Sequence, residues 1–129
     1  MLKRFFAGRD VRVKSEIVLP GGDVLKVNLD VSANRLELNK AFNETLKPAT
    51  LYAKDPSPEN KGAFYGAYGR LLALILGAKN YEKALKAYEG DAVELCRQLD
   101  HWVAVAFAPK LSEASRQELA QRKKQFRRK

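Results

Sequence analysis

The chain has 129 residues, enough for one domain with a substantial core, and its 46% apolar content is that of an ordinary globular protein. The formal charge of +9 lies at the two ends: residues 1–16 hold five basic and two acidic side chains, and residues 116–129 hold seven and one. The residues between them are balanced, which indicates a neutral body with basic extensions rather than a domain that is basic throughout.

The sequence contains no segment that is apolar enough to cross a membrane. The apolar runs are short, and residues 71–76, for example, cover about a third of a membrane span. The positive start resembles a signal peptide, but Arg9 and Asp10 stand where an apolar region would be required. The single cysteine, Cys96, excludes an internal disulfide and lies in a helical pattern, where we expect a buried side chain. We therefore expect a cytoplasmic protein with no membrane contact.

Two segments near the start alternate between apolar and polar residues with a period of two. This pattern predicts strands over residues 11–19 and 25–31. The turn-forming run Pro-Gly-Gly-Asp at 20–23 separates them, so we expect an antiparallel hairpin within residues 11–31. An isolated hairpin is marginally stable in water, so its apolar face has to pack on the rest of the chain.

The apolar residues of both strands carry odd numbers, which restricts the register of the hairpin. Partners on the same face must have numbers with an even sum, since a slip of one residue moves every side chain to the other face. We expect Leu19 opposite Leu25 and Ile17 opposite Val27.

From residue 33 on, the sequence predicts helices. Ser32 is the expected N-cap of the first, and Leu38, Phe42 and Leu46 follow at helical spacing before Pro48 ends it.

The next segment, residues 48–61, contains three prolines and several charged residues and is predicted to be a linker. A helix over 62–76, ending at Gly77, is apolar most of the way round and should be the central one. Another helix is expected over 80–89, ending at Gly90.

The last helical region begins at Asp91 and Glu94, which have the spacing of a capping box. Pro109 is expected to break or kink this helix. Residues 122–129 carry six positive charges and are predicted to be a disordered basic tail. One apolar stripe of this region consists of Val93, Cys96, Leu99, Val103 and Phe107.

Together these elements predict an α+β fold, with an N-terminal β-hairpin packed on a mainly α-helical bundle of four to five helices. Residues 1–121 should form a single domain, and residues 122–129 the tail.

The sequence offers no arrangement of residues suited to catalysis. His101 lies five residues after Cys96, about 140° around a helix, so the two side chains do not face each other. The acidic residues are scattered or lie at helical spacing from basic ones, which is typical of a solvated surface. We expect neither an enzyme nor a bound cofactor or metal.

The second half of the chain resembles the small tail assembly chaperones encoded by phages and prophages of Gram-positive bacteria. The features that carry the resemblance are a hydrophobic helix over 64–76 followed by the sequence GAKNYEKAL, then YEGD at 88–91 and another apolar helix. Pro109-Lys110 and a basic tail ending in Arg-Arg-Lys complete the pattern.

This resemblance implies a non-enzymatic role. Chaperones of this family bind the long helical tape-measure protein during tail assembly, keep it soluble and self-associate around it. An α-rich domain with an apolar groove can accept an amphipathic helix through anchors at i, i+3, i+4 and i+7.

The expected binding surface consists of aromatic residues on the helix faces, a choice made on physical grounds because the resemblance marks no binding residues. These candidate partner-binding residues are Phe64, Tyr68, Tyr88, Trp102 and Phe107. Each of them could equally belong to the core.

The alternative function is that of a small basic nucleic-acid-binding protein that uses both charged ends. Several phosphate contacts from the tail would give a salt-sensitive, sequence-independent affinity. A charged tail can also dock on an acidic protein surface, and charge alone does not distinguish the two. The candidate nucleic-acid-binding residues are Arg122, Lys123, Lys124, Arg127, Arg128 and Lys129.

Overall fold

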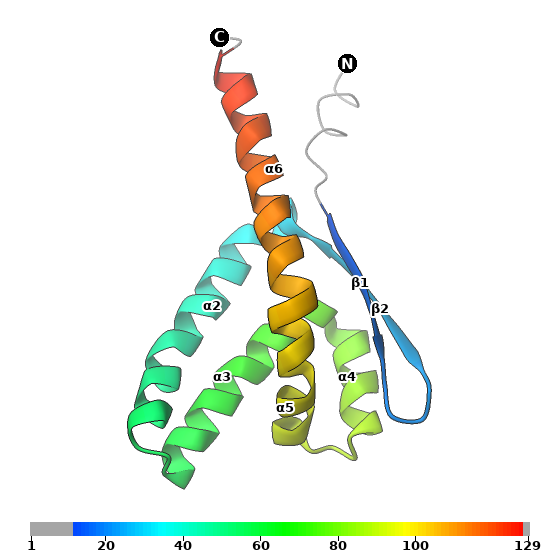
Figure 1. Ribbon diagram of the computed structural model, residues 1–129, viewed down its shortest axis with the longest axis vertical. Helices are drawn as coiled ribbons and strands as arrows, with labels where there is room; N and C mark the ends of the chain where they lie inside the picture. The colour runs from blue at the N-terminus through cyan, green and yellow to red at the C-terminus, as the bar shows by residue number, and fades with distance from the viewer. Residues whose placement is uncertain (1–11, 128–129) are drawn as a thin grey trace.

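The structure is a computed structural model that describes residues 12–127, apart from the side chains of Glu118 and of residues 121–127. It confirms the expected α+β fold, with a two-stranded antiparallel hairpin followed by a mainly helical body (Figure 1). The elements are β1 Arg12–Val18, β2 Val24–Asp30, α2 Val31–Lys54, α3 Pro58–Leu76, α4 Ala78–Ala87, α5 Ala92–Trp102, the π-helical turn η1 Val103–Phe107, and α6 Ala108–Arg127.

The apolar side chains of the hairpin lie on the predicted inward face, but the register of the two strands differs from the prediction. Ile17 lies opposite Leu25 rather than Val27, so the pairing is displaced by two residues. A displacement of two keeps every side chain on its own face, and the even-sum rule holds. The expected Val11 end of the first strand lies outside the described residues.

The hairpin loop accounts for the displacement. The backbone N–H of Leu19 donates to the carbonyl of Asp23 at 2.7 Å, so the loop closes two residues earlier on the second strand than expected. Gly21 and Gly22 turn the chain with φ of 93° and 97°, values that glycine adopts without a steric penalty.

The apolar face of the hairpin is covered by helices. In Figure 1 the hairpin lies beside α4, and its strands also contact η1 and α6. The buried residues of this face are Val13, Ile17, Leu19, Leu25, Val27 and Leu29. Side-chain hydrogen bonds also join the hairpin to helices that are distant in the sequence: Asn80 to the Lys26 carbonyl (3.0 Å), Trp102 to the Ser15 hydroxyl (3.0 Å) and Lys110 to the Lys14 carbonyl (2.7 Å).

Helix α2 begins directly after β2, without a loop. Its N-cap is Asp30, not the expected Ser32, because the Asp30 carboxylate accepts a hydrogen bond from the N–H of Ala33 at 3.0 Å. The last residue of the strand therefore also caps the helix.

The predicted linker over residues 48–61 is wrong. Helix α2 continues through Pro48 to Lys54, and α3 begins at Pro58, so only three residues connect them. The hydroxyl of Ser57 accepts from the N–H of Asn60 at 3.2 Å and caps α3, and Pro58 occupies a first-turn position where its missing N–H costs nothing. Packing between α2 and α3 keeps Pro48 within a helix despite the lost hydrogen bond.

Helix α3 is central, as predicted, and contacts α2, α4, α5 and β2. It ends at Gly77, and the connection after α4 includes Gly90; their φ values of 87° and 79° favour glycine. The buried residues of α3 are Ala67, Gly69, Leu71, Leu72, Ile75 and Leu76.

The expected break at Pro109 does not occur, since the chain stays helical from α5 through η1 into α6. The N–H of Ala108 donates to the carbonyl of Val103, five residues earlier, which gives a π turn just before the proline. This wider turn makes room for the proline ring. The backbone is helical to Arg127, so the tail expected from residue 122 is not irregular up to that point; residues 128–129 lie outside the described part.

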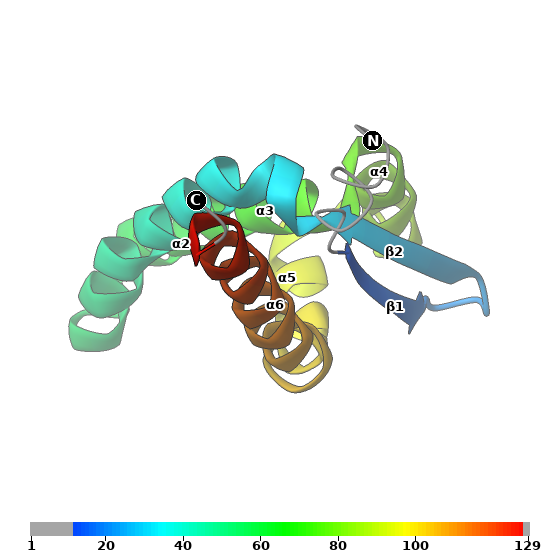
Figure 2. The same cartoon turned by 90° about the horizontal axis from the view of Figure 1, so that it is seen from above.

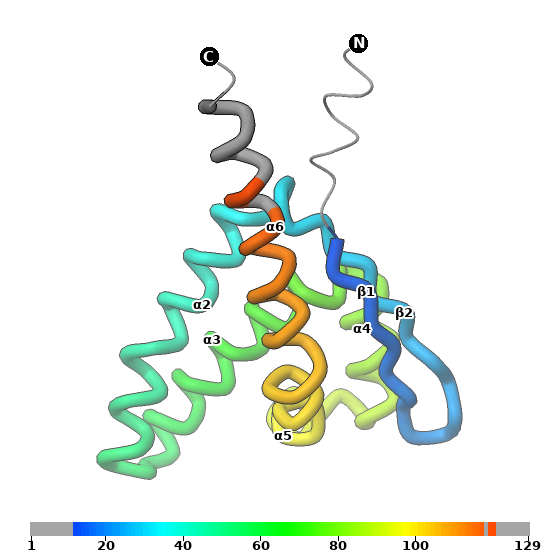
Figure 3. Tube along the Cα trace, turned by 45° about the horizontal axis from the view of Figure 1, so that its top comes forward, coloured from blue at the N-terminus to red at the C-terminus, as the bar shows by residue number. Residues whose placement is uncertain are grey.

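The core lies where the hairpin, the second half of α3, α5, η1 and the start of α6 meet. The outer parts of α2 and α3 extend away from it, as Figure 2 shows from above and Figure 3 in a tilted view. No residue from 39 to 66 is fully buried. We call this segment, the helical hairpin formed by residues 39–66, the arm.

Candidate functional site

An aromatic cluster joins the arm to the body. Tyr52 of α2 stacks on Phe64 of α3, with ring centroids 5.8 Å apart and planes inclined by 23°. Phe64 also contacts Tyr65 at 5.0 Å and Tyr68 at 5.8 Å. All four side chains are half-buried. The spacing of Phe64 and Tyr68, i and i+4, places them on one helix face, as predicted for a helix over this segment.

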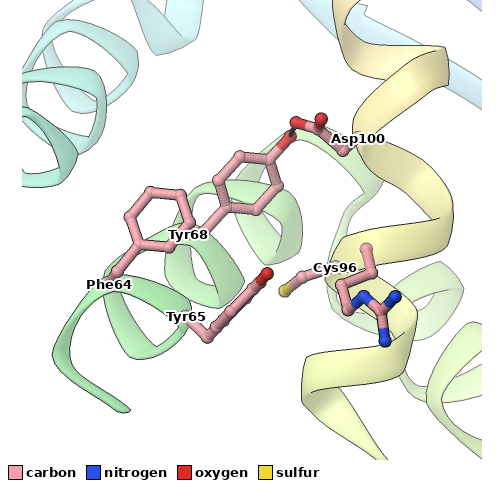
Figure 4. Close-up of a pocket in the computed structure, with 6 residues that line it drawn as sticks. Phe64, Tyr65, Tyr68, Cys96 and Asp100 are labelled. Atoms are coloured by element: carbon pink, nitrogen blue, oxygen red, sulfur yellow. Dashed lines mark hydrogen bonds between the residues drawn. The ribbon is translucent and has the colours of Figure 1, made fainter. Parts of the chain in front are cut away.

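A hollow of about 300 Å³ lies between this face of α3 and α5 (Figure 4). Helix α3 contributes the aromatic rings of Phe64, Tyr65 and Tyr68, and α5 contributes the polar side. The residues from α5 are Cys96, Arg97 and Asp100.

Asp100 is the exposed carboxylate of the hollow, and Tyr68 fixes its position. The Tyr68 hydroxyl donates a hydrogen bond of 3.0 Å to Asp100 (Figure 4). Burial raises the pKa of Tyr68 above its ordinary value, and the charge and hydrogen bond of Asp100 raise it further. Tyr68 therefore stays protonated at neutral pH and remains a donor to the carboxylate.

Cys96 forms the floor of the hollow and is not suited to nucleophilic chemistry. It is 1% exposed, and burial, with a smaller effect from Asp100, raises the pKa of its thiol to about 11. The reactive thiolate is thus scarce at neutral pH. His101 is exposed on the surface of α5. Among the residues that the structure describes, no three His, Cys, Asp or Glu side chains could hold a metal ion.

The five residues predicted for partner binding lie in three separate places. Phe64 and Tyr68 line the hollow together. Phe107 is fully buried, and the Trp102 ring packs on it with centroids 5.5 Å apart, so these two support the core and hold the hairpin. Tyr88 is the C-cap residue of α4, half-buried and packed against the core.

Four residues of this site were not among those predicted from the sequence. Tyr52 was placed in a linker, and Tyr65 was not selected. Arg97 and Asp100 were not considered, because nothing in the sequence indicates that α5 lies across from α3. Helical spacing does place Cys96 and Asp100 on one face, four residues apart, and was the available signal.

The six basic residues of the nucleic-acid alternative have side chains outside the described part of the chain. The described part does contain a second basic location. Lys14 and Lys26 of the hairpin and Lys110 of α6 line a hollow of about 450 Å³, together with Glu16 and Asn28.

No protein-family model, curated protein or solved structure matches this chain. Its function has to be inferred from its own residues and geometry. None of the helices in residues 12–127 is long and apolar enough to span a membrane.

Proposed function

We propose that this chain is a non-enzymatic protein that binds an amphipathic helical partner, in the manner of a phage or prophage tail assembly chaperone. The observation that supports this best is the arm. Over residues 39–66 it contains no fully buried residue, yet Leu46 and Leu51 are 63% and 44% exposed and the aromatic cluster lies at its base.

The arm is held together by packing between α2 and α3, but α2 has its last fully buried residue at Leu38. Helices in proteins owe most of their stability to tertiary packing of an apolar face, so further apolar contacts would stabilise the arm. Leu46 and Leu51 lie about 140° apart around α2, so partner helices packed on more than one side of the arm would bury both leucine side chains and the half-buried aromatic rings. Contacts of this type are hydrophobic, so the complex should persist at high salt.

The resemblance supplies the identity of the partner and a second role. It implies that the partner is the tape-measure protein, a long helical protein of the phage tail, and that the chaperone self-associates around it. The arm offers the same apolar surface to a second copy of the chain as to the partner, so both roles are compatible with one surface.

The test is affinity isolation from a nuclease-treated lysate of the native host, with bound proteins identified by mass spectrometry. We expect the full chain to retain a long helical protein at about 0.3 M salt, where the Debye length is roughly 6 Å. The double variant Leu46→Glu/Leu51→Glu should lose it. Leu36→Glu is the matched control, since Leu36 is 74% exposed on the same helix but outside the arm.

A further variant separates this function from the alternative. Replacing the six basic residues of 122–129 by glutamine should leave partner retention unchanged. If retention disappears with the tail charges and persists in the arm variant, the arm is not the binding surface.

The second candidate function is nucleic-acid binding. The three lysine side chains around the hollow beside the hairpin support it, because they add to the positive charge at the chain ends. It predicts an affinity for nucleic acid that falls steeply with salt and weakens when the tail is neutralised. Gel-shift titrations of a duplex at several salt concentrations measure both effects.

A further inference from the structure

We propose that the hollow between α3 and α5 receives one cationic side chain, a lysine or arginine, from the helical partner. This inference rests on the proposed function and names the chemistry by which the partner is recognised.

The aromatic wall favours a cation. Phe64, Tyr65 and Tyr68 bring three rings together on one side of the hollow, with centroids of neighbouring rings 5.0–5.8 Å apart. The faces of aromatic rings carry partial negative charge and attract ammonium and guanidinium groups. The volume of about 300 Å³ is at the low end for ligand pockets and suits a single long side chain.

The carboxylate of Asp100 supplies the opposite charge. It accepts a hydrogen bond from the neutral hydroxyl of Tyr68, and no cation forms an ion pair with it among the side chains that the structure describes. Because Asp100 is exposed at the rim of the hollow, a bound partner would remove water from it. A desolvated carboxylate is costly unless a cation pairs with it.

Arg97 does not cancel this charge, because it is already paired. Its guanidinium lies 3.4 Å from the Glu94 carboxylate, one helical turn earlier on α5. Arg97 also lines the hollow, but with Glu94 and Asp100 the charged side chains on this side of α5 sum to −1. This net charge favours a cationic occupant over an anionic one, and an apolar occupant would leave the Asp100 carboxylate without a counter-charge.

The test uses the full chain and a small probe, so that it does not depend on knowing the partner. The probe is N-acetyl-lysine methylamide, and its neutral counterpart is N-acetyl-norleucine methylamide, which has the same four-carbon side chain without the ammonium group. Titration is followed by amide NMR to about 50 mM, because one side chain without its helix binds weakly. We expect shifts confined to the amides around the hollow with the lysine probe, and an affinity at least about tenfold lower with norleucine.

Variants assign the effect to Asp100. Asp100→Asn should remove the preference for the lysine probe, whereas Glu82→Gln, which deletes one exposed negative charge on α4, should leave it intact. Both variants should keep the wild-type amide spectrum away from the substituted site. Equal binding of the two probes, scattered shifts, or an equal loss in both variants would overturn the proposal.

The outcome is independent of the arm experiment. If the lysine probe does not bind while the arm variant still loses its partner, the proposed function stands and the cation site is wrong. If the probe binds as expected and the arm is not needed for partner retention, the cation site stands and the proposed function is wrong.

Discussion

At the scale of single residues, the same side chain takes different roles according to what surrounds it. Phe64 and Phe107 both lie on helical stripes in the sequence and were equivalent candidates. Phe107 is fully buried against Trp102, whereas Phe64 is half-buried in the aromatic cluster at the base of the arm. Burial depends on which elements meet, and periodicity along one helix does not determine it.

Phe107→Ala should lower the free energy of unfolding by about 3–5 kcal/mol, because it removes a fully buried ring and leaves a cavity. Phe64→Ala is the matched control and should cost much less, since part of its ring is already in contact with water. Urea unfolding followed by circular dichroism measures both. Equal losses in the two variants would contradict the assignment of Phe107 to the core.

At the scale of the elements, proline and cap residues explain the main differences between expectation and structure. Pro48 was expected to end a helix, Pro58 to lie in a linker, and Pro109 to break or kink a helix. Pro58 instead begins α3, Pro48 lies inside α2, and Pro109 follows a π turn within a continuous helical region. Proline is common in the first turn of a helix and disrupts a helix interior, so its presence alone does not tell the two apart. The packing of the flanking residues decides between them.

The N-cap of α2 is open to a direct test. Asp30→Ala should lower the free energy of unfolding by about 1 kcal/mol, because the N–H of Ala33 loses its acceptor. Asp30→Asn retains a side-chain oxygen and should stay near wild type, since the exposed pair of Asp30 with Arg12 at 3.6 Å contributes little. Thermal or urea unfolding gives the comparison. A large loss in the Asn variant would mean that the charge, and not the cap, stabilises this junction.

At the scale of the whole molecule, the chain consists of a neutral body with a well-buried core, an arm without buried residues, and basic ends. The body carries most of the hydrophobic stabilisation, and the arm presents the exposed Leu46 and Leu51 side chains to the surroundings. Segments with few buried contacts open at low free-energy cost, so we place partner binding there.

Burial of the tyrosine and cysteine side chains makes the free energy of unfolding depend on pH in the alkaline range. The pKa values of Tyr65, Tyr68, Tyr81 and Tyr88 are raised above 10, mainly by burial, and that of Cys96 is raised to about 11 from 9.0. Above their ordinary pKa values these groups ionise in the unfolded chain before they do so in the folded one. The stability they contribute is therefore complete below about pH 9 and is lost as the pH rises through the folded values.

We expect the free energy of unfolding to fall between about pH 9 and pH 11, and to fall less in Tyr68→Phe, which removes the most strongly shifted tyrosine of the hollow. Urea unfolding at each pH, with tyrosinate absorbance recorded in parallel, measures this. Stability that is constant over this interval would show that the tyrosine side chains ionise equally in both states.

The sequence by itself determined the α+β fold class, the inward face of the hairpin, the central position of α3 and the glycine positions near the ends of α3 and α4. These depend on local periodicity and on backbone conformations that few residues tolerate. Only the tertiary structure decided the hairpin register, the continuity of α2 through Pro48, and the meeting of Tyr52, Phe64, Tyr68 and Asp100 around one hollow. These features depend on contacts between segments that are distant in the sequence. The free energy of such contacts depends on both segments and on how they pack, so it cannot be predicted from the residues of one segment alone.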